Sequence, residues 1–335
     1  LCYEEGEGVE RSPEKAVACY REAAEQGFVP AQCNLGFCYY AGIGVEEDER
    51  EAVVWFSRAA EQRFARALAL LAECHLYGRG VEKDEARAAQ LFQEAVDCGS
   101  DAALCDLGYL YEIGAGVPRD PEKAVSLYQQ SAERGVPRGQ CNLGFCYEAG
   151  IGVERDPALA VEYYRQAAEQ GLARAQCNLG FCYYRGLGVE EDNDMAVAWF
   201  TRAAEQGHPR ALYLLGECVW FGYGLRADHA AAVTYYQRAA DLDYPPAICE
   251  LGYLYEAGSG VEQDAERAAS LYRKAADMGY SKAQCNLGFC YEAGIGVTMD
   301  KARAVELYRL AADQGLARAK CCLGFCYENG IGVAP

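Results

Sequence analysis

The sequence predicts an all-α protein built as an α-solenoid, in which helix-turn-helix repeats stack one after another. The first observation is a Gly-x-Gly pair that returns every 36 residues without insertion, from Gly6 and Gly8 to Gly330 and Gly332. The second is an apolar pattern of helical spacing on both sides of each pair. A fixed period of this length is typical of repeats that share one continuous hydrophobic core.

The first helix of each repeat, helix A, is predicted over about 31–41 in one copy. Leu35, Cys38 and Tyr39 lie at positions i, i+3 and i+4, so they fall on one face of a helix. Gly42 then supplies the positive φ angle at which helices commonly end. A position in any repeat is numbered below by the residue of this copy that it matches.

The second helix, helix B, is predicted to follow Asp48, because an aspartate there accepts hydrogen bonds from the free N–H groups of the first turn. Ala52 recurs as alanine in all nine copies and Phe56 recurs as Phe or Tyr, so a small residue and an aromatic ring pack beside each other. The equivalent capping residues are Ser12, Asp84, Asp120, Asp156, Asp192, Asp228, Asp264 and Asp300. Glycines are expected to end most copies of helix B, namely Gly27, Gly99, Gly135, Gly171, Gly207, Gly279 and Gly315.

The pattern A-x-x-x-L-G-x-x-Y-x-x-G-x-G-V-x-x-D-x-x-x-A covers the whole chain and resembles the Sel-one-like repeat family, a relative of tetratricopeptide repeats. The resemblance implies a right-handed α-solenoid that acts as an adaptor or scaffold for protein partners. Because no repeat is interrupted, we expect residues 1–335 to form a single array of about nine repeats, with partial repeats at both ends. Leu1 and Pro335 both fall inside the pattern, so we also expect the chain to belong to a longer protein.

A second period of 144 residues, equal to four repeats, is superposed on the first. The stretch ALALLAEC (67–74) returns as ALYLLGEC (211–218), and CDLGYLYE (105–112) returns as CELGYLYE (249–256). Equivalent surfaces would then recur every four repeats, which predicts two equivalent partner sites.

Charge and composition limit the classes of partner. The 335 residues carry a net charge of −19, whereas nucleic-acid backbones and anionic membrane surfaces attract basic proteins. We therefore expect no nucleic-acid partner. We also expect no membrane insertion, because the sequence has no run of about 18 apolar residues. Residues 1–30 show no basic segment followed by an apolar one, so no signal peptide is recognisable.

The repeated glycines do not indicate a cofactor site. A dinucleotide fingerprint needs a preceding strand and a third glycine, whereas a predicted helix precedes each pair and that glycine is missing. The three histidines, His75, His208 and His229, form no repeated ligand set, and no nucleophile, base and orienting group recur together. We therefore expect no catalytic residues, no metal site, no cofactor and no enzymatic activity.

The chain contains 18 cysteines, most of them at two positions of helix A. Residues five apart point about 140° apart around a helix, so Cys33 and Cys38 cannot bridge or share a metal within their helix. In secreted relatives, a disulfide joins helix A to the end of helix B, where this sequence has Ala-Ala. We expect buried free thiols and hence a reducing compartment such as the cytoplasm. Sulfur contacts between neighbouring repeats and an exported form both stay open.

The resemblance also indicates a partner-binding surface. The groove-facing positions of a tetratricopeptide helix A map onto positions 30, 33, 37 and 40, with position 34 beside them, and this spacing keeps them on one face. The stripe would have an aromatic floor, a basic edge at position 30 and an acidic edge at position 40. Asparagine amides at position 34 can hold a peptide backbone. The candidate groove residues are Cys33, Asn34, Phe37, Tyr40, Asn142, Phe145, Asn178, Phe181, Tyr184, Tyr213, Trp220, Asn286 and Phe289.

Other interpretations of this stripe stay open. The aromatic residues at position 37 can instead pack between neighbouring repeats, and the arginines at position 30 can pair with glutamates of helix B such as Glu61. Glu73 and Glu217 replace the aromatic residue at position 37 in two repeats and are candidate specificity residues.

The hypothesis that follows is a non-enzymatic scaffold that binds peptides or partner domains in its concave groove. The alternative is a cysteine-rich redox or metal-handling repeat protein, which thiol titration and metal analysis would distinguish. A hydrolase or cell-wall-binding activity is suggested only by relatives that act at bacterial surfaces, and no residue pattern supports its chemistry.

Overall fold

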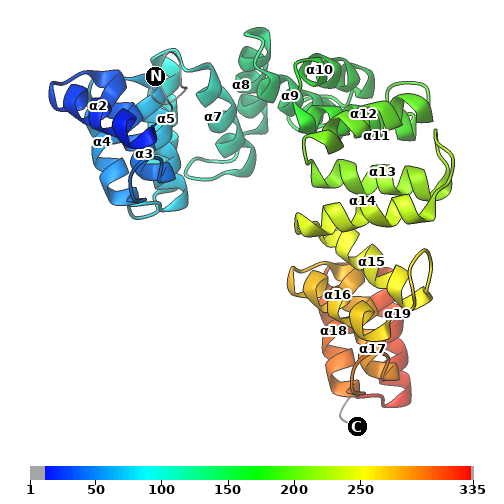
Figure 1. The fold of residues 1–335 in the computed structure, drawn as a ribbon. Helices are drawn as coiled ribbons and strands as arrows, with labels where there is room; N and C mark the ends of the chain where they lie inside the picture. Colours follow the sequence, from blue (N-terminus) through cyan, green and yellow to red (C-terminus); the bar gives the residue numbers. More distant parts are fainter. Residues whose placement is uncertain (1–11, 333–335) are drawn as a thin grey trace. The chain divides into compact units, whose positions relative to one another are not determined.

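The computed structural model describes residues 12–332, which contain eighteen α-helices and no strand (Figure 1). Each helix is 13 residues long, and within this part of the chain none is long and apolar enough to cross a bilayer. The chain divides into two compact units, residues 1–170 and residues 171–335. The all-α solenoid of paired helices is confirmed, and the assignment of 1–335 to a single array stays a prediction.

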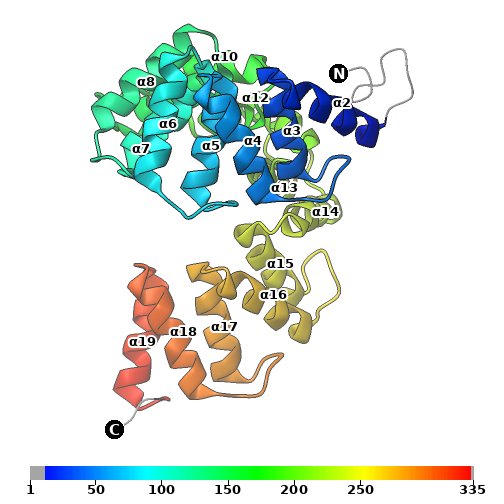
Figure 2. The same ribbon diagram turned by 90° about the vertical axis from the view of Figure 1, so that its left-hand side faces the viewer.

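Helix A and helix B alternate through both units. The N-terminal unit contains α2 (Pro13–Glu25), α3 (Val29–Ala41), α4 (Glu49–Glu61), α5 (Ala65–Tyr77), α6 (Glu85–Asp97), α7 (Asp101–Ile113), α8 (Pro121–Glu133), α9 (Pro137–Ala149) and α10 (Pro157–Glu169). The C-terminal unit contains α11 (Ala173–Arg185), α12 (Asn193–Glu205), α13 (Pro209–Phe221), α14 (His229–Asp241), α15 (Pro245–Ala257), α16 (Ala265–Asp277), α17 (Ser281–Ala293), α18 (Lys301–Asp313) and α19 (Ala317–Asn329). Odd-numbered helices are copies of helix A. From α3 to α17, each packs against the helix B that follows it, as α17 and α18 show in Figure 2.

The turn between the two helices follows the predicted pattern. Gly42 ends α3 with φ of 65°, a left-handed conformation that glycine adopts without strain. The carboxylate of Asp48 then accepts hydrogen bonds from the backbone N–H groups of Arg50 and Glu51, both at 3.0 Å. Ser12 is the exception, because its hydroxyl donates to the Glu14 carboxylate and accepts no hydrogen bond from a backbone N–H group of the first turn of α2.

Helix A and helix B of one repeat approach closely through a glycine and an aromatic ring. A Cβ atom placed on Gly144 would lie 2.9 Å from ring atoms of Tyr164, whose side chain is completely buried. The missing side chain therefore makes the space that the ring fills. The same contact is made by Gly36 with Phe56, Gly108 with Tyr128, Gly180 with Phe200, Gly216 with Tyr236, Gly252 with Tyr272 and Gly288 with Tyr308.

Consecutive repeats meet at the second glycine of the Gly-x-Gly pair. A Cβ atom on Gly80 would lie 2.1 Å from the carbonyl oxygen of Glu49, the first residue of α4. At Gly296 the corresponding distance to the carbonyl oxygen of Ala265 is 1.9 Å. The turn of one repeat thus rests directly on the backbone of helix B in the preceding repeat, and no side chain fits between them.

Candidate functional site

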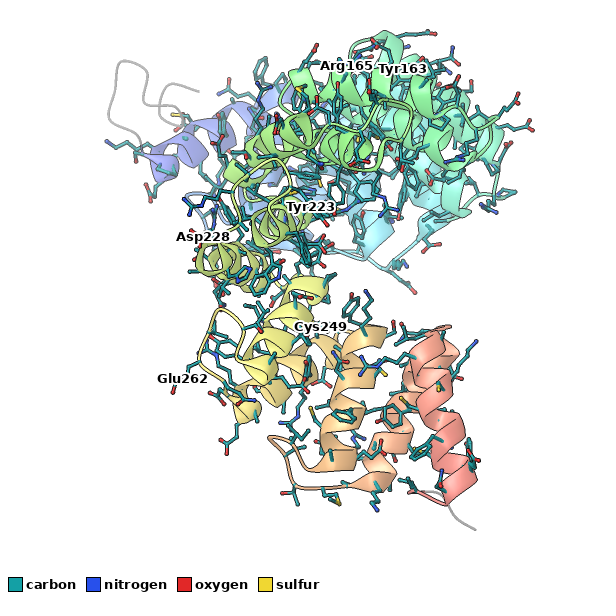
Figure 3. The ribbon with its side chains drawn as sticks, turned by 90° about the vertical axis from the view of Figure 1, so that its right-hand side faces the viewer. Tyr163, Arg165, Tyr223, Asp228, Cys249 and Glu262 are labelled. Atoms are coloured by element: carbon teal, nitrogen blue, oxygen red, sulfur yellow. The ribbon has the colours of Figure 1, made fainter. Side chains whose placement is uncertain are left out.

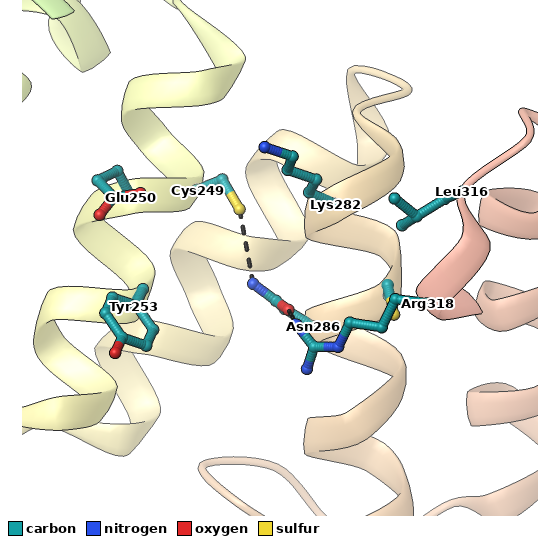
Figure 4. A pocket seen from close by; sticks show the side chains of 8 residues that line it. Cys249, Glu250, Tyr253, Lys282, Asn286, Leu316 and Arg318 are labelled. Carbon is teal, nitrogen blue, oxygen red and sulfur yellow. Dashed lines mark hydrogen bonds between the residues drawn. The ribbon is translucent and has the colours of Figure 1, made fainter. Parts of the chain in front are cut away.

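A pocket of ≈360 Å³ lies in the C-terminal unit among α15, α17 and α19, which are helices A of three successive repeats. Figure 3 shows Cys249 on α15, and Figure 4 shows the pocket from close by. Its walls come from positions 30, 33, 34 and 37, with one residue from the loop before α19. The lining residues are Cys249, Glu250, Tyr253, Lys282, Cys285, Asn286, Leu316 and Arg318.

The amide of Asn286 connects two helices across this pocket. Its Nδ2 donates to the sulfur of Cys249 at 3.7 Å, and its Oδ1 accepts from Nη1 of Arg318 at 3.0 Å. Burial and the neighbouring Glu217 raise the pKa of Glu250, whereas Lys282 lowers it, and the net direction is upward. Positive, negative and amide groups therefore surround the same space.

The contact of Arg318 with Asn286 is repeated at other junctions between repeats. Arg66 donates to Oδ1 of Asn34 at 3.1 Å, and Arg210 donates to Oδ1 of Asn178 at 3.3 Å. The arginine at position 30 therefore pairs with position 34 of the preceding repeat rather than with a glutamate of helix B.

Position 34 varies together with position 30 of the next repeat. Arg138 forms an ion pair with Asp106 at 2.5 Å, and Lys282 lies near enough to Glu250 to lower its pKa. Where position 34 is leucine, the next position 30 carries no charge: Leu70 is followed by Ala102, and Leu214 by Pro246. This covariation was present in the sequence, between residues 32 apart, and a comparison of adjacent repeats would have found it.

The predicted aromatic floor at position 37 is accessible to solvent. Phe145 is 44% exposed and Phe289 is 42% exposed. Phe37 and Phe181 are half-buried, because the guanidinium groups of arginines at position 30 lie 5.6 Å and 4.8 Å from their ring centroids.

Cys33, predicted to face the groove, is instead completely buried beside Ala59 and Ala67. Burial raises the pKa of its thiol to about 11. Tyr213 at the same position is half-buried, and its hydroxyl donates to Glu217 at 2.9 Å. Asn142, like the other asparagines at position 34, is half-buried.

Position 40 makes packing contacts in every predicted case. Arg79 donates to the hydroxyl of Tyr40 and lies over its ring. The ring of Tyr184 contacts that of Phe200, at 6.4 Å between centroids. Trp220 stacks on His229 at 4.1 Å. Part of the surface of Tyr40, Tyr184 and Trp220 is therefore covered by contacts with other side chains of the array.

Glutamates of the predicted acidic edge at position 40 accept hydrogen bonds from tyrosines of their own repeats. The hydroxyl of Tyr164 donates to Glu148 at 2.5 Å, and that of Tyr272 donates to Glu256 at 2.6 Å. The same bond joins Tyr128 to Glu112 and Tyr308 to Glu292. The sequence already contained this correlation. Where position 40 is Glu, position 56 of these repeats is Tyr, and where position 40 is Tyr, position 56 is Phe.

Glu73 and Glu217, the candidate specificity residues, have raised pKa values. Burial is the main cause for both carboxyls. Asp106 adds to the effect on Glu73, and Arg138 opposes it. Lys282 and the Tyr213 hydroxyl oppose it at Glu217. Each carboxylate therefore lies in the field of a position-30 cation two repeats further along.

The buried cysteines at the two repeated positions of helix A are poor nucleophiles. Burial is the largest cause that raises the thiol pKa of Cys74, Cys218 and Cys249 to about 12, so these sulfurs stay protonated at neutral pH, and the reactive thiolate is scarce. No group of three or more His, Cys, Asp or Glu side chains within residues 12–332 is arranged to hold a metal ion.

The chain belongs to the Sel1-repeat family. The Sel1 repeat model matches ten consecutive ranges, 1–28, 29–64, 65–100, 101–136, 137–172, 173–208, 209–244, 245–280, 281–316 and 317–335. Proteins built from these repeats are generally scaffolds for protein–protein interaction, and their solenoid is typically non-catalytic. No curated protein sequence matches the chain.

Solved structures show the same architecture. A protective antigen present in uropathogenic Escherichia coli strains, which displays an SLR fold, is 35% identical over 100% of this chain and 72% of that one, with a TM-score of 0.68. A Sel1 repeat protein from Oxalobacter formigenes is 34% identical over 92% of this chain and 89% of that one, with a TM-score of 0.62. Yeast Tom70 shares the fold alone, at 12% identity over 84% of this chain and 59% of that one, with a TM-score of 0.50.

Proposed function

We propose that this protein is a non-enzymatic scaffold that binds peptide segments of partner proteins along its groove face, defined as positions 30, 34 and 37 of successive helices A. The observation that supports this most is the pocket of ≈360 Å³, whose walls come from the same positions of three repeats. A surface made by repetition suits an extended peptide, because the peptide also presents its groups at regular intervals.

The chemistry of the groove face fits such a ligand. Tyr253 is 54% exposed and Phe289 is 42% exposed, and large exposed aromatic side chains are enriched where proteins bind one another. The amide of Asn286 can donate to and accept from a peptide backbone. The position-30 and position-34 charges then select among side chains.

We also propose two equivalent partner sites, one in each compact unit. In both units, a half-buried carboxyl at position 37 interacts with a carboxylate at position 34 of the next repeat and with the following position-30 cation. The two sets are Glu73, Asp106 and Arg138, and Glu217, Glu250 and Lys282, at a separation of 144 residues. Calorimetry with one groove-binding peptide should give two equal sites per chain, and a single site would contradict this part of the proposal.

Selection of random 12-residue peptides displayed on phage, against the full chain, tests the groove directly. Selected peptides should lose affinity for a variant with Tyr253→Ala and Phe289→Ala, which removes two exposed rings without opening the core. A matched control carries Met299→Ala and Leu310→Ala, at side chains that are 56% and 53% exposed outside the groove face. The proposal is wrong if no peptide is selected, or if both variants bind the selected peptides equally.

A further inference from the structure

The position-30 arginines differ in whether their charge is neutralised. Arg138 meets the carboxylate of Asp106, whereas Arg66, Arg210 and Arg318 meet the neutral amides of asparagines. Among residues 12–332, none of these three guanidinium groups forms an ion pair with a carboxylate. Each guanidinium carries five N–H donors, of which the asparagine oxygen takes only one. A full positive charge and several donors therefore remain available on the groove face.

The pocket in the C-terminal unit gathers several such donors. Lys282, Arg318 and Nδ2 of Asn286 line the same ≈360 Å³, and Glu250 is the one carboxylate among the lining residues. The Asn286 amide nitrogen is bonded to the sulfur of Cys249 at 3.7 Å, which is a weak acceptor. A carboxylate oxygen is a better acceptor for that N–H and for both cations.

We infer, building on the proposed scaffold function, that the asparagine-paired arginines bind carboxylate side chains of an acidic, extended peptide segment. Arg318, Lys282 and Asn286 form the main site. The exposed rings of Tyr253 and Phe289 contact the apolar neighbours of the acidic residue. Arg66 and Arg210 repeat the same guanidinium–amide arrangement at two other junctions.

The acidity of the whole chain does not oppose this assignment at short range. The net charge of −19 repels an acidic peptide at long range, but interactions beyond about 8 Å are largely screened at physiological ionic strength. A guanidinium and a carboxylate in direct contact are partly shielded from that screening and add the directionality of two parallel hydrogen bonds. Local contacts therefore decide the preference for acidic residues.

The junction between Asp106 and Arg138 shows which substitution tests the inference. Asn286→Asp reproduces at this junction the carboxylate that neutralises Arg138, with almost no change in side-chain volume. The control is Thr298→Glu, which adds the same charge at an exposed loop position where six other repeats carry glutamate, namely Glu10, Glu46, Glu82, Glu154, Glu190 and Glu262. Both variants should keep the far-UV circular dichroism spectrum of the parent chain.

The experiment compares peptide selection and affinity for the three proteins. Random 12-residue peptides selected on the parent chain should be enriched in Asp and Glu. By fluorescence anisotropy, replacement of the acidic residues by Gln or Asn should weaken binding about tenfold or more, a change of about 1.4 kcal/mol. Asn286→Asp should remove most of that difference, and Thr298→Glu should preserve it.

Two results would overturn the inference while leaving the scaffold function intact. In the first, groove-dependent peptides show no enrichment in acidic residues, or bind equally well after amidation. In the second, Asn286→Asp and Thr298→Glu change the affinity of the acidic peptide by the same factor. If no peptide depends on the groove at all, the proposed function fails and the inference fails with it.

Discussion

Replacement of Gly296 by alanine measures how strongly one repeat is fixed to the next. Gly296 has φ of 66°, a conformation in which a Cβ atom costs about 1–2 kcal/mol. That Cβ would also lie 1.9 Å from the carbonyl oxygen of Ala265. A backbone oxygen cannot rotate away, so the two repeats must separate, and overpacking of this kind costs about 1–3 kcal/mol. We expect the free energy of unfolding to fall by about 2–5 kcal/mol in total.

Gly315→Ala is the matched control. Gly315 has φ of 90°, and a Cβ there would meet nothing within 4 Å. Two other repeats already carry a non-glycine residue at this position, Arg63 with φ of 58° and Asp243 with φ of 54°. We expect a loss of about 1–2 kcal/mol from backbone strain alone. Urea unfolding of both full-length variants, followed by far-UV circular dichroism, gives the difference, and equal losses would refute the assignment of Gly296 to repeat stacking.

Three further predictions concern a tyrosine hydroxyl, a carboxyl group and two thiols. Tyr272→Phe removes the 2.6 Å hydrogen bond to Glu256 and should cost about 1–3 kcal/mol in urea unfolding, and the added change Glu256→Tyr should recover part of that loss; no recovery would contradict the pairing rule. Burial raises the pKa of Glu217, so its ionised form destabilises the folded state at pH 7 and Glu217→Gln should raise Tm. That gain should shrink as the pH falls through the raised pKa, because the native carboxyl then takes up a proton before the unfolded one does; a gain independent of pH between 4 and 8 would show another cause. A disulfide reagent at pH 8 should label the exposed Cys321 in the native protein and Cys249, with its thiol pKa of about 12, only after unfolding; peptide mass mapping that finds both labelled at one rate would contradict this.

The helices were predictable from the sequence because their limits depend on local chemistry. Gly42 ends a helix through its own φ angle, and Asp48 caps the next one through bonds to residues two and three positions away. Ser12 shows the limit of that reasoning. A residue type that can cap a helix start does not always make the bond, and α2 begins at Pro13 without it.

The assignment of side chains to the groove was only partly accessible. Helical spacing places Cys33 and Phe37 near one face, but helix A also packs against helices of neighbouring repeats. Cys33 is therefore buried, whereas Tyr253 and Phe289 are exposed. A small apolar residue such as cysteine gives no signal about which of these environments it occupies.

The pairings across repeats were recoverable but needed a different comparison. Alignment of the repeats shows what recurs at each position, whereas Arg66 with Asn34 is a contact between different positions of adjacent copies. Only variation reveals it: the charge at position 30 disappears where position 34 is leucine, as in Leu70 and Ala102. The hydrogen bond between Tyr272 and Glu256 also joins two different positions of the repeat, so alignment of the repeats does not show it.

The junction pairs restrict how an array of this kind can grow. From the second to the ninth repeat, position 34 is Asn, Leu, Asp, Asn, Asn, Leu, Glu and Asn in turn. A second copy of the repeat that contains Leu70 would put this leucine before an arginine, and a second copy of the repeat that contains Asp106 would put this carboxylate before an alanine. Either insertion would leave a polar group without its partner. Insertion of four repeats together leaves the pairs matched. Engineered arrays can therefore be lengthened or shortened by 144 residues, whereas a single repeat of 36 residues fits only where its own side chains at positions 30 and 34 match, as Arg138 and Asn142 do.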